Sequence, residues 1–481
     1  MSALYQHIFS VLKPILPECI LVGTGILALL AGLLFRKEYI TWIAWGSFAG
    51  IMGAGITLVL SREISGIIFE GAVLSDPLAF FFRFFFILAC SVSMLASMPY
   101  VRIEESRRSE YCAFLLFAAV GMMFLASAGD LITLYLAGEL VALPSALLAG
   151  FTRENKSHEG AIKFLILHGV MTGVLIYGMS LVYGIAGTTA LSGIQEFFEA
   201  ADVFPPVMIL GLIMMIAGLL FKIAAVPFHL WMPDLFEGAP LPVTAFLSAA
   251  FPAAGFAILI RIFFVMAEPF AGFLTILTSL IAVLSMAVGT IMALSQTNVK
   301  RMFTYLLIAH CGYAFIGFAA GGDDGIASSV FSICFFGVMH LAAYTAVFVM
   351  NQSGMGESIS DFEGLGHANP VVALLVSVYL TSLAGVPPFA GFMCKFSLLQ
   401  SALHAGLGWL AAAGLLFWLL GAYCCLRIVM SIYTRESQGS VRLPAPSLTV
   451  ALWISALVLL AGGIYPAPLL DAAAASILPF F

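Results

Sequence analysis

Charged residues are scarce in this chain of 481 residues. Asp, Glu, Lys and Arg together make up 9% of it, and hydrophobic residues make up 62%. A soluble domain carries about 25% charged residues. The composition therefore excludes an ordinary soluble domain and predicts a protein that lies in a lipid bilayer.

Sequence motifs for metals and cofactors are missing as well. The eight cysteines form no CxxC pair and fall in or beside apolar runs, so we interpret them as small buried residues rather than metal ligands or disulfides. There is no glycine-rich nucleotide loop, no cysteine cluster for iron and sulfur, and no basic cluster for nucleic acid. We therefore expect a chain that binds no metal, cofactor or nucleic acid itself. Its N-terminus shows no cleavable signal and is expected to remain as the first span.

Long apolar runs dominate the chain instead. At about 20 residues per crossing, they predict an all-α polytopic membrane protein with fourteen spans and both ends on one side. The weakest boundary is Ala128-Gly129-Asp130, between the fourth and fifth spans. The expected spans lie near 17–35, 39–60, 77–98, 111–128, 130–151, 160–184, 206–226, 242–266, 271–295, 301–320, 326–350, 369–400, 406–430 and 446–469.

Basic residues are unequally shared between the two sets of loops. One set, which includes the N-terminal segment, offers only Lys13 and Arg62. The positive-inside rule places the richer set in the cytoplasm and both termini outside. The richer set comprises Arg36, Lys37, Arg102, Arg107, Arg108, Arg153, Lys156, Lys300, Arg301, Arg435 and Arg442.

One apolar run is interrupted by polar residues and prolines. It begins near Pro206, carries Lys222, breaks at Pro227 and resumes after Gly238-Ala239-Pro240. A lysine at mid-bilayer costs about 2.5–3.5 kcal/mol on insertion scales, so it needs a partner or a hydrated cavity. Pro227 also frees a backbone carbonyl, which must be satisfied by protein or water. The run therefore predicts a discontinuous helix 7 beside an internal cavity.

A second break is similar to the first. Val386-Pro387-Pro388-Phe389 parallels Val226-Pro227-Phe228, and Lys395 follows it by about two turns. Two lysines beside two breaks suggest two related halves, a transporter design in which repeats of five spans have to be inverted. We expect helices 1–3 in 1–110, repeats in 111–266 and 267–433, and helix 14 in 434–481.

Three ionisable residues are the main candidates for proton transfer. Glu139 lies mid-span among apolar, Gly, Ser and Thr residues, where a carboxylate is functional by default and a structural hydrogen-bonding group is the alternative. Lys222 is its candidate ion-pair partner, because opposite charges favour each other's charged form. Changing this pair would load or release a proton. Lys395 is the third candidate, as a terminal donor or acceptor toward the outside.

Four more residues are candidates for a supporting relay. Lys163 lies one turn inside the sixth span and either takes part or extends to the membrane surface. His229 follows the first break and either relays protons or binds a freed carbonyl. His310 and His340 lie in spans ten and eleven, where they either carry a path between Lys222 and Lys395 or are core histidines with satisfied hydrogen bonds.

Three other polar residues within spans are interpreted without a role in transport. His168 is expected to be structural. Arg83 and Arg261 lie near span ends, from which long basic side chains reach the interface.

The segment around the first break is similar to a family signature. It reads KIAAVPFHLWMPDLFEGAPLPVTAFLS from Lys222 to Ser248 and resembles the antiporter-like subunits of respiratory complex I and their Mrp-antiporter and membrane-hydrogenase relatives. The resemblance covers nearly the whole chain and is closest to subunit N of NADH:quinone oxidoreductase. It extends through LPECIL at 16–21, DPLAFFFR at 76–83, GMMFLASAGDLITLYLAGEL at 121–140, QTNVKRMFTYLLIAHCGY at 296–313 and LTSLAGVPPFAGFMCKF at 380–396.

The resemblance implies fourteen spans, two inverted five-span repeats, and proton movement through buried charged residues. It places the family's fifth-span glutamate at Glu139, the seventh-span lysine at Lys222 and the twelfth-span lysine at Lys395, and it supports Lys163. It implies other membrane subunits and the redox subunits of a peripheral arm as partners. NADH and quinone are used by that whole complex, in a bacterial inner membrane with both termini on the periplasmic side.

One position departs from the family pattern. Relatives usually carry a lysine in the eighth span, in a pattern like SKAAGF, whereas this chain has Pro252 before Ala253-Ala254-Gly255-Phe256. One possibility is that water around Pro252, aided by His310 or His340, bridges Lys222 and Lys395. The other is that this subunit pumps protons differently from the standard subunit of the family.

The expected function is proton translocation as a membrane subunit of a respiratory NADH:quinone oxidoreductase. Moving one charge against 100 mV requires about 2.3 kcal/mol, so we expect coupling to a partner subunit that carries out oxidation or to another ion gradient. A cation/proton antiporter subunit of the Mrp type, in which Glu139 and the broken helices bind the cation, is an alternative. A second alternative is a membrane subunit of a hydrogenase-type complex. A third is a scaffold that does not pump protons, and Pro252 is the best argument for it.

Overall fold

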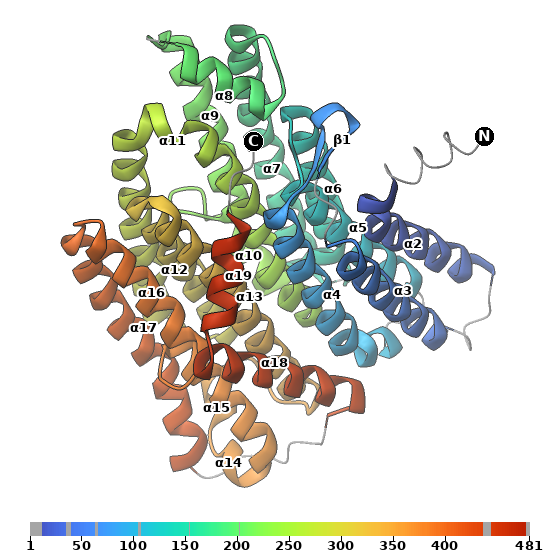
Figure 1. The fold of residues 1–481 in the computed structure, drawn as a ribbon. Coiled ribbons are helices and arrows are strands. Elements are labelled where there is room, and N and C mark those ends of the chain that lie inside the picture. The colour runs from blue at the N-terminus through green and yellow to red at the C-terminus, as the bar shows by residue number, and fades with distance from the viewer. Residues whose placement is uncertain are drawn as a thin grey trace.

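The computed structural model describes residues 12–34, 40–62, 66–103, 107–152, 154–201, 203–435 and 444–477, and they are almost entirely helical (Figure 1). Within these ranges, thirteen helices are long and apolar enough to cross a membrane. A shorter apolar helix, α15 (Pro370–Ala384), continues after a break into α16 (Ala390–His404) and supplies one more crossing. The expected all-α architecture of fourteen spans is confirmed.

The N-terminal helices lie at one side of the bundle and are drawn in blue in Figure 1. They are α2 (Leu16–Leu34), α3 (Ile40–Leu60) and α4 (Pro77–Ile103). A short turn, η1 (Lys13–Ile15), precedes α2. Between α3 and α4, β1 (Gly66–Ile68) and β2 (Val73–Ser75) pair antiparallel with Gly66 opposite Ser75, joined by η3 (Phe69–Gly71).

Two buried arginines connect these helices to their neighbours. Nε of Arg83 in α4 lies 2.9 Å from Oε1 of Glu18 in α2, and both side chains are nearly inaccessible. Arg261 forms a bidentate ion pair with Asp76, with N···O distances of 2.7 and 2.9 Å. The expectation that Arg83 and Arg261 reach the membrane interface is therefore wrong, because Glu18 in α2 and Asp76, just before α4, pair with them inside the bundle.

The first half of the core runs from α5 to the beginning of α11. The weak boundary at residues 128–130 is a real division, because α5 ends at Ala126 and Asp130 caps the next helix by accepting a hydrogen bond from the Thr133 N–H at 2.6 Å. The helices are α5 (Arg108–Ala126), α6 (Leu131–Ala149), α7 (Asn155–Ala186), α8 (Leu191–Ala200), α9 (Pro206–Ile223), α10 (Trp231–Gly238) and α11 (Leu241–Leu294).

Helix α11 contains two spans in one continuous run of 54 residues. At 1.5 Å per residue a straight helix of this length would measure about 80 Å, far more than the roughly 30 Å of hydrocarbon in a bilayer. Leu241–Met266 and Pro269–Leu294 each have the length and composition of a separate crossing. They correspond to the expected eighth and ninth spans.

The second half is built around two helices that are buried along nearly their whole length, α12 (Val299–Ala320) and α13 (Gly322–Gln352). Helices α15 and α16 pack on α13, and α17 packs on α15. The remaining elements are η4 (Ile359–Phe362), α14 (Leu365–Ala368), α17 (Gly408–Thr434), α18 (Pro446–Ile464) and α19 (Ala467–Ser476).

Some of the basic residues used to predict orientation lie buried in helices, and others fall outside the described residues. Arg108 and Lys300 were expected in loops, but both lie in the first turn of a helix and are buried. Arg36, Lys37, Arg153 and Arg442 fall outside the described residues, as does the side chain of Arg102. The direction of the chain across the membrane remains a prediction from charge.

Candidate functional site

The first break joins α9 to α10 through residues 224–230, and protein groups satisfy the backbone that it frees. The indole N–H of Trp231 donates to the carbonyl of Phe221 at 3.0 Å. The N–H of Val226 donates to the hydroxyl of Ser285, also at 3.0 Å. Non-helical backbone at membrane depth is tolerated only with such partners, so the break is a fixed feature of the interior.

Glu139 lies in the middle of α6 and is held by two side chains of α7. Its Oε1 is 3.0 Å from Nε2 of His168 and accepts a hydrogen bond from the hydroxyl of Thr172 at 3.1 Å. The carboxylate side chain is 24% exposed, whereas His168 is 4% exposed. One oxygen is thus fixed inside the bundle while the group keeps some access from outside it.

Lys222 lies in the last turn of α9 and points toward the same part of α6. A Cβ built on Gly138 would come 2.9 Å from Nζ of Lys222, so the glycine next to Glu139 leaves room for the ammonium group. Lys222 is buried and within electrostatic range of Glu139, but it forms no direct ion pair with it in the described part of the chain. The two charges of the predicted Glu139–Lys222 pair thus interact at a distance, while Nε2 of His168 makes the direct contact with the carboxylate.

His168 and Thr172 are the two residues of this site that the sequence reasoning missed. The sequence alone favours a structural role for His168 and does not distinguish Thr172. They are four residues apart in a helical region, a spacing that puts both on one face. That spacing was the available signal, but a single carboxylate on another helix gave no reason to pair it with this face.

The second break places Lys395 at the end of α15. Its Nζ donates to the carbonyl of Leu383 at 3.0 Å and lies 3.5 Å from that of Ala384. The indole N–H of Trp418 donates to the same Ala384 carbonyl at 2.8 Å. Nζ also lies 5.5 Å from the ring centroid of Tyr313 and 5.7 Å from that of Trp418, within the range of cation–π attraction. Lys395 is 1% exposed.

Two histidines extend this second site. Nδ1 of His310 in α12 is 2.9 Å from Nε2 of His340 in α13, so the rings share a direct hydrogen bond. The carbonyl of Leu383 also interacts with the His310 ring, which lies within electrostatic range of Lys395. Both rings are buried. The structure therefore brings His310, His340 and Lys395 together.

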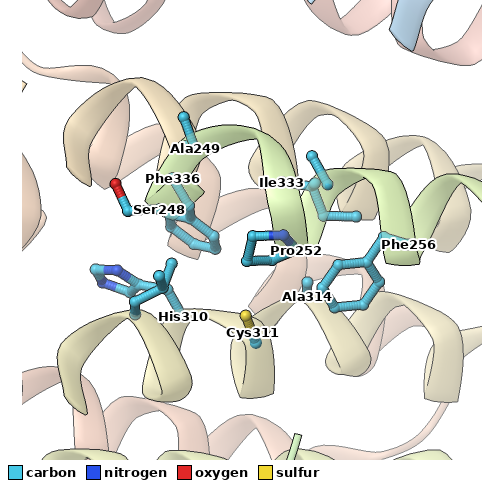
Figure 2. A pocket seen from close by; sticks show the side chains of 12 residues that line it. Ser248, Ala249, Pro252, Phe256, His310, Cys311, Ala314, Ile333 and Phe336 are labelled. Carbon is cyan, nitrogen blue, oxygen red and sulfur yellow. The ribbon is translucent and has the colours of Figure 1, made fainter. Parts of the chain in front are cut away.

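A small apolar cavity lies beside Pro252 in α11. It measures about 10 Å³ and is lined by Ser248, Pro252, Phe256, His310 and Phe336 among others. Figure 2 shows Pro252 and His310 bordering the same space. This volume matches about one water molecule, but a water needs two to four polar partners. The lining offers few of them.

Lys163 and His229 lie apart from these two clusters. Nζ of Lys163 is 2.7 Å from Glu159 and 3.0 Å from Asp234, and its side chain is 48% exposed. His229 is buried within the first break and interacts with the carbonyl of Pro227. The structure does not bring either residue into contact with Glu139 or Lys395.

A network of ion pairs anchors α10 at the end of the bundle. Nη1 of Arg301 lies 2.6 Å from Glu237, and Nη2 lies 3.5 Å from Asp234. Lys163 pairs with Asp234 as described, and Lys156 lies 3.4 Å from Glu237. The acidic residues of the signature thus hold the short helix against α7 and α12. No group of three or more His, Cys, Asp or Glu side chains suited to a metal occurs within the described ranges.

Comparisons with known proteins match this architecture and these motifs. The family model described as NADH:quinone oxidoreductase/Mrp antiporter, transmembrane part, matches residues 128–421. NADH-quinone oxidoreductase subunit N 2 of Rhizobium meliloti is 41% identical over 458 residues, which is 94% of each chain.

Solved structures agree in fold. A chain of respiratory complex I from Thermus thermophilus superposes with a TM-score of 0.80 at 27% identity, covering 96% of this chain and 100% of that one. A chain of the Mrp complex from Dietzia sp. has a TM-score of 0.83 at 18% identity, covering 98% and 97%, a likeness that shows the fold alone. The chain belongs to the NADH:quinone oxidoreductase/Mrp antiporter family, and within it to the subunit N membrane proteins of NADH:quinone oxidoreductase.

Proposed function

We propose that this subunit moves protons across a bacterial inner membrane through Glu139, Lys222 and Lys395, driven by quinone reduction with NADH in partner subunits. The observation that carries the proposal is the pairing of two buried lysines with two helix breaks. Lys222 lies at the end of α9 and Lys395 at the carbonyl end of α15. Ionisable groups at such depth are costly and mark ion pathways by default.

The supporting residues have different roles in this function. His168 and Thr172 hold the Glu139 carboxylate, so a change in the charge at Lys222 acts on a fixed partner. His310 and His340 provide ring nitrogens next to Lys395. Lys163 and His229 belong to the surroundings of α10 and serve to position that helix.

We assign the two halves of the site to two proposed repeats, 111–266 and 267–433. Each contains one interrupted helix, α9 with α10 or α15 with α16. In each, a tryptophan indole binds a carbonyl at the break, Trp231 in the first and Trp418 in the second. We place both termini on the periplasmic side, on the distribution of basic residues.

The experiment that tests this function separates proton pumping from cation exchange. Inside-out membrane vesicles that contain the assembled complex are energised with NADH in buffers with and without Na⁺ and K⁺, and internal acidification is followed with a pH dye. We expect acidification at the same rate in all buffers, with a loss in Glu139→Gln at equal amounts of complex. Acidification that requires Na⁺ or K⁺ would instead support a cation/proton antiporter.

A further inference from the structure

The inference below rests on the proposed function and concerns how Lys395 receives its proton. No hydrogen-bonded connection runs from Lys222 to His310 among the described residues. The end of α9 meets α11 through aromatic rings instead, with centroids 5.6 Å apart for Phe221 and Trp231 and 5.4 Å apart for Trp231 and Phe251. Phe251 precedes Pro252, whose cavity is small and apolar. Protons would have to cross this apolar region to reach the second half from the first.

The histidine pair has an open nitrogen that points to another source. In the His310–His340 hydrogen bond, Nε2 belongs to His340. The other nitrogen of that ring, Nδ1, is fully buried and has no hydrogen-bond partner among the described residues. A buried unsatisfied polar group costs about 1–3 kcal/mol, so its presence requires an explanation. The open Nδ1 of His340 is explained if it is the position at which the histidine pair receives protons.

A pair of hydroxyl groups lies one turn further along α13. Tyr344 follows His340 by four residues, and their ring centroids are 6.5 Å apart. The Tyr344 hydroxyl is 2.8 Å from that of Thr304 and donates to the carbonyl of Lys300 at 3.1 Å. Both side chains are buried. Hydroxyl groups both donate and accept hydrogen bonds, so this pair can pass a proton without holding a charge.

The hydroxyl pair leads to the first turn of α12, which is close to the membrane surface. Nζ of Lys300 lies 3.4 Å from Oε1 of Glu357, whose side chain is 25% exposed. Glu357 belongs to the loop before η4, and its backbone carbonyl accepts a hydrogen bond from the N–H of Val299. A partly exposed carboxylate is therefore fixed at the end of α12, on the side that the basic residues predict to be the cytoplasm.

We propose that Lys395 is loaded from the Glu357 end of α12 through Thr304, Tyr344, His340 and His310, rather than from Lys222 across Pro252. A water molecule passes the proton from the hydroxyl pair to Nδ1 of His340. His340 gives its Nε2 proton to Nδ1 of His310, and His310 gives up one proton to the neutral amine of Lys395, which becomes an ammonium ion. One proton enters and one reaches Lys395, so the transfer balances without any other reactant.

The test compares Tyr344→Phe with Tyr379→Phe in membranes that contain the whole complex. Tyr379 is equally buried and also donates one hydrogen bond, to the carbonyl of Leu452 at 2.7 Å, but it lies outside the proposed route. Lys395→Gln serves as the reference for the loss of proton transfer through the second half of the site. The measured quantity is the number of protons translocated per NADH oxidised, which does not depend on the amount of complex.

We expect Tyr344→Phe to lower this ratio to the value found for Lys395→Gln and Tyr379→Phe to leave it unchanged. Thr304→Val should lower it in the same direction, because it removes the second hydroxyl. The route is overturned if Lys395→Gln lowers the ratio and Tyr344→Phe matches Tyr379→Phe. If Lys395→Gln itself has no effect, the proposed function fails, and this result is distinct from the failure of the route.

Discussion

The two lysines at the breaks are stabilised in different ways. Lys395 donates to the Leu383 carbonyl and lies beside two aromatic rings. Lys222 has no such set of partners in the described part of the chain and depends on the charge of Glu139 and on the space above Gly138. Lys222 is therefore the more sensitive of the two to small changes in its surroundings.

Gly138→Ala tests this sensitivity. The new methyl group would come 2.9 Å from Nζ of Lys222 and displace the ammonium group, whereas the substitution itself favours helix by about 1 kcal/mol. We expect the complex to assemble normally but to translocate protons up to about a hundredfold more slowly, because a misplacement of about 1 Å can cost that much. NADH-driven acidification in vesicles measures the rate.

Gly169→Ala is the matched control, since a Cβ at Gly169 meets nothing within 4 Å. It should leave the rate unchanged. If Gly138→Ala pumps as fast as Gly169→Ala, the position of the Lys222 ammonium group does not matter.

At the scale of elements, both interrupted helices are stabilised by a tryptophan hydrogen bond at the break. An indole N–H binds a carbonyl at the end of the first half-helix, from Trp231 to Phe221 and from Trp418 to Ala384. Each tryptophan thereby replaces part of the hydrogen bonding that the break removes. The indole at the first break comes from the second half-helix, α10, and the indole at the second break comes from a neighbouring helix, α17. Side-chain hydrogen bonds therefore help to determine the conformation of each break, beside its prolines.

Trp231→Phe should destabilise the subunit. It removes one of the two donors to the Phe221 carbonyl, which keeps the Ala224 N–H at 3.0 Å. A net hydrogen bond contributes about 0.5–1.5 kcal/mol, and the loss of packing against Phe164 and Phe251 adds to it. The melting temperature of the purified complex, followed through this subunit by limited proteolysis, measures the effect. Trp409→Phe is the control because Trp409 is exposed on α17, and an equal shift in both variants would argue against a specific role for the indole N–H.

At the scale of the whole molecule, buried ion pairs connect the N-terminal helices to one another and to the core. Glu18 and Arg83 link α2 with α4, and Asp76 and Arg261 link the beginning of α4 with α11. These residues explain the motifs LPECIL and DPLAFFFR, which contain one or two of them each. The motifs thus serve assembly of the bundle rather than proton transfer.

A double substitution tests the Glu18–Arg83 pair. Arg83→Met leaves the Glu18 carboxylate buried without its partner, which costs about 3–5 kcal/mol, whereas replacing both members is often close to neutral. We expect little assembled complex with Arg83→Met and substantial recovery with Arg83→Met and Glu18→Gln together, as measured by the amount of subunit in purified complex. No recovery in the double variant would mean that the arginine acts through other contacts, such as the Pro14 carbonyl.

Much of the fold followed from periodic apolar runs, because about 20 apolar residues per crossing leave few alternatives. The positions of Glu139, Lys222 and Lys395 stood out for the same reason, since each is a charge inside such a run. What joins them did not follow from the sequence. The partner of Glu139 is a histidine on α7, and Arg261 pairs with Asp76 from 185 positions earlier. Such pairs depend on which helices pack against each other, and the positions of apolar runs in the sequence do not reveal this.

The direct test of the account is proton translocation together with NADH oxidation in vesicles that carry Lys222→Ala, at a verified amount of assembled complex. Lys156→Ala is the control, because its side chain is 76% exposed and lies in the network around α10. Positioned proton donors contribute about 10²–10⁴-fold to a rate, so we predict that both activities fall at least about tenfold in Lys222→Ala alone. Unchanged translocation in Lys222→Ala would contradict the account and leave the chain a scaffold that does not pump.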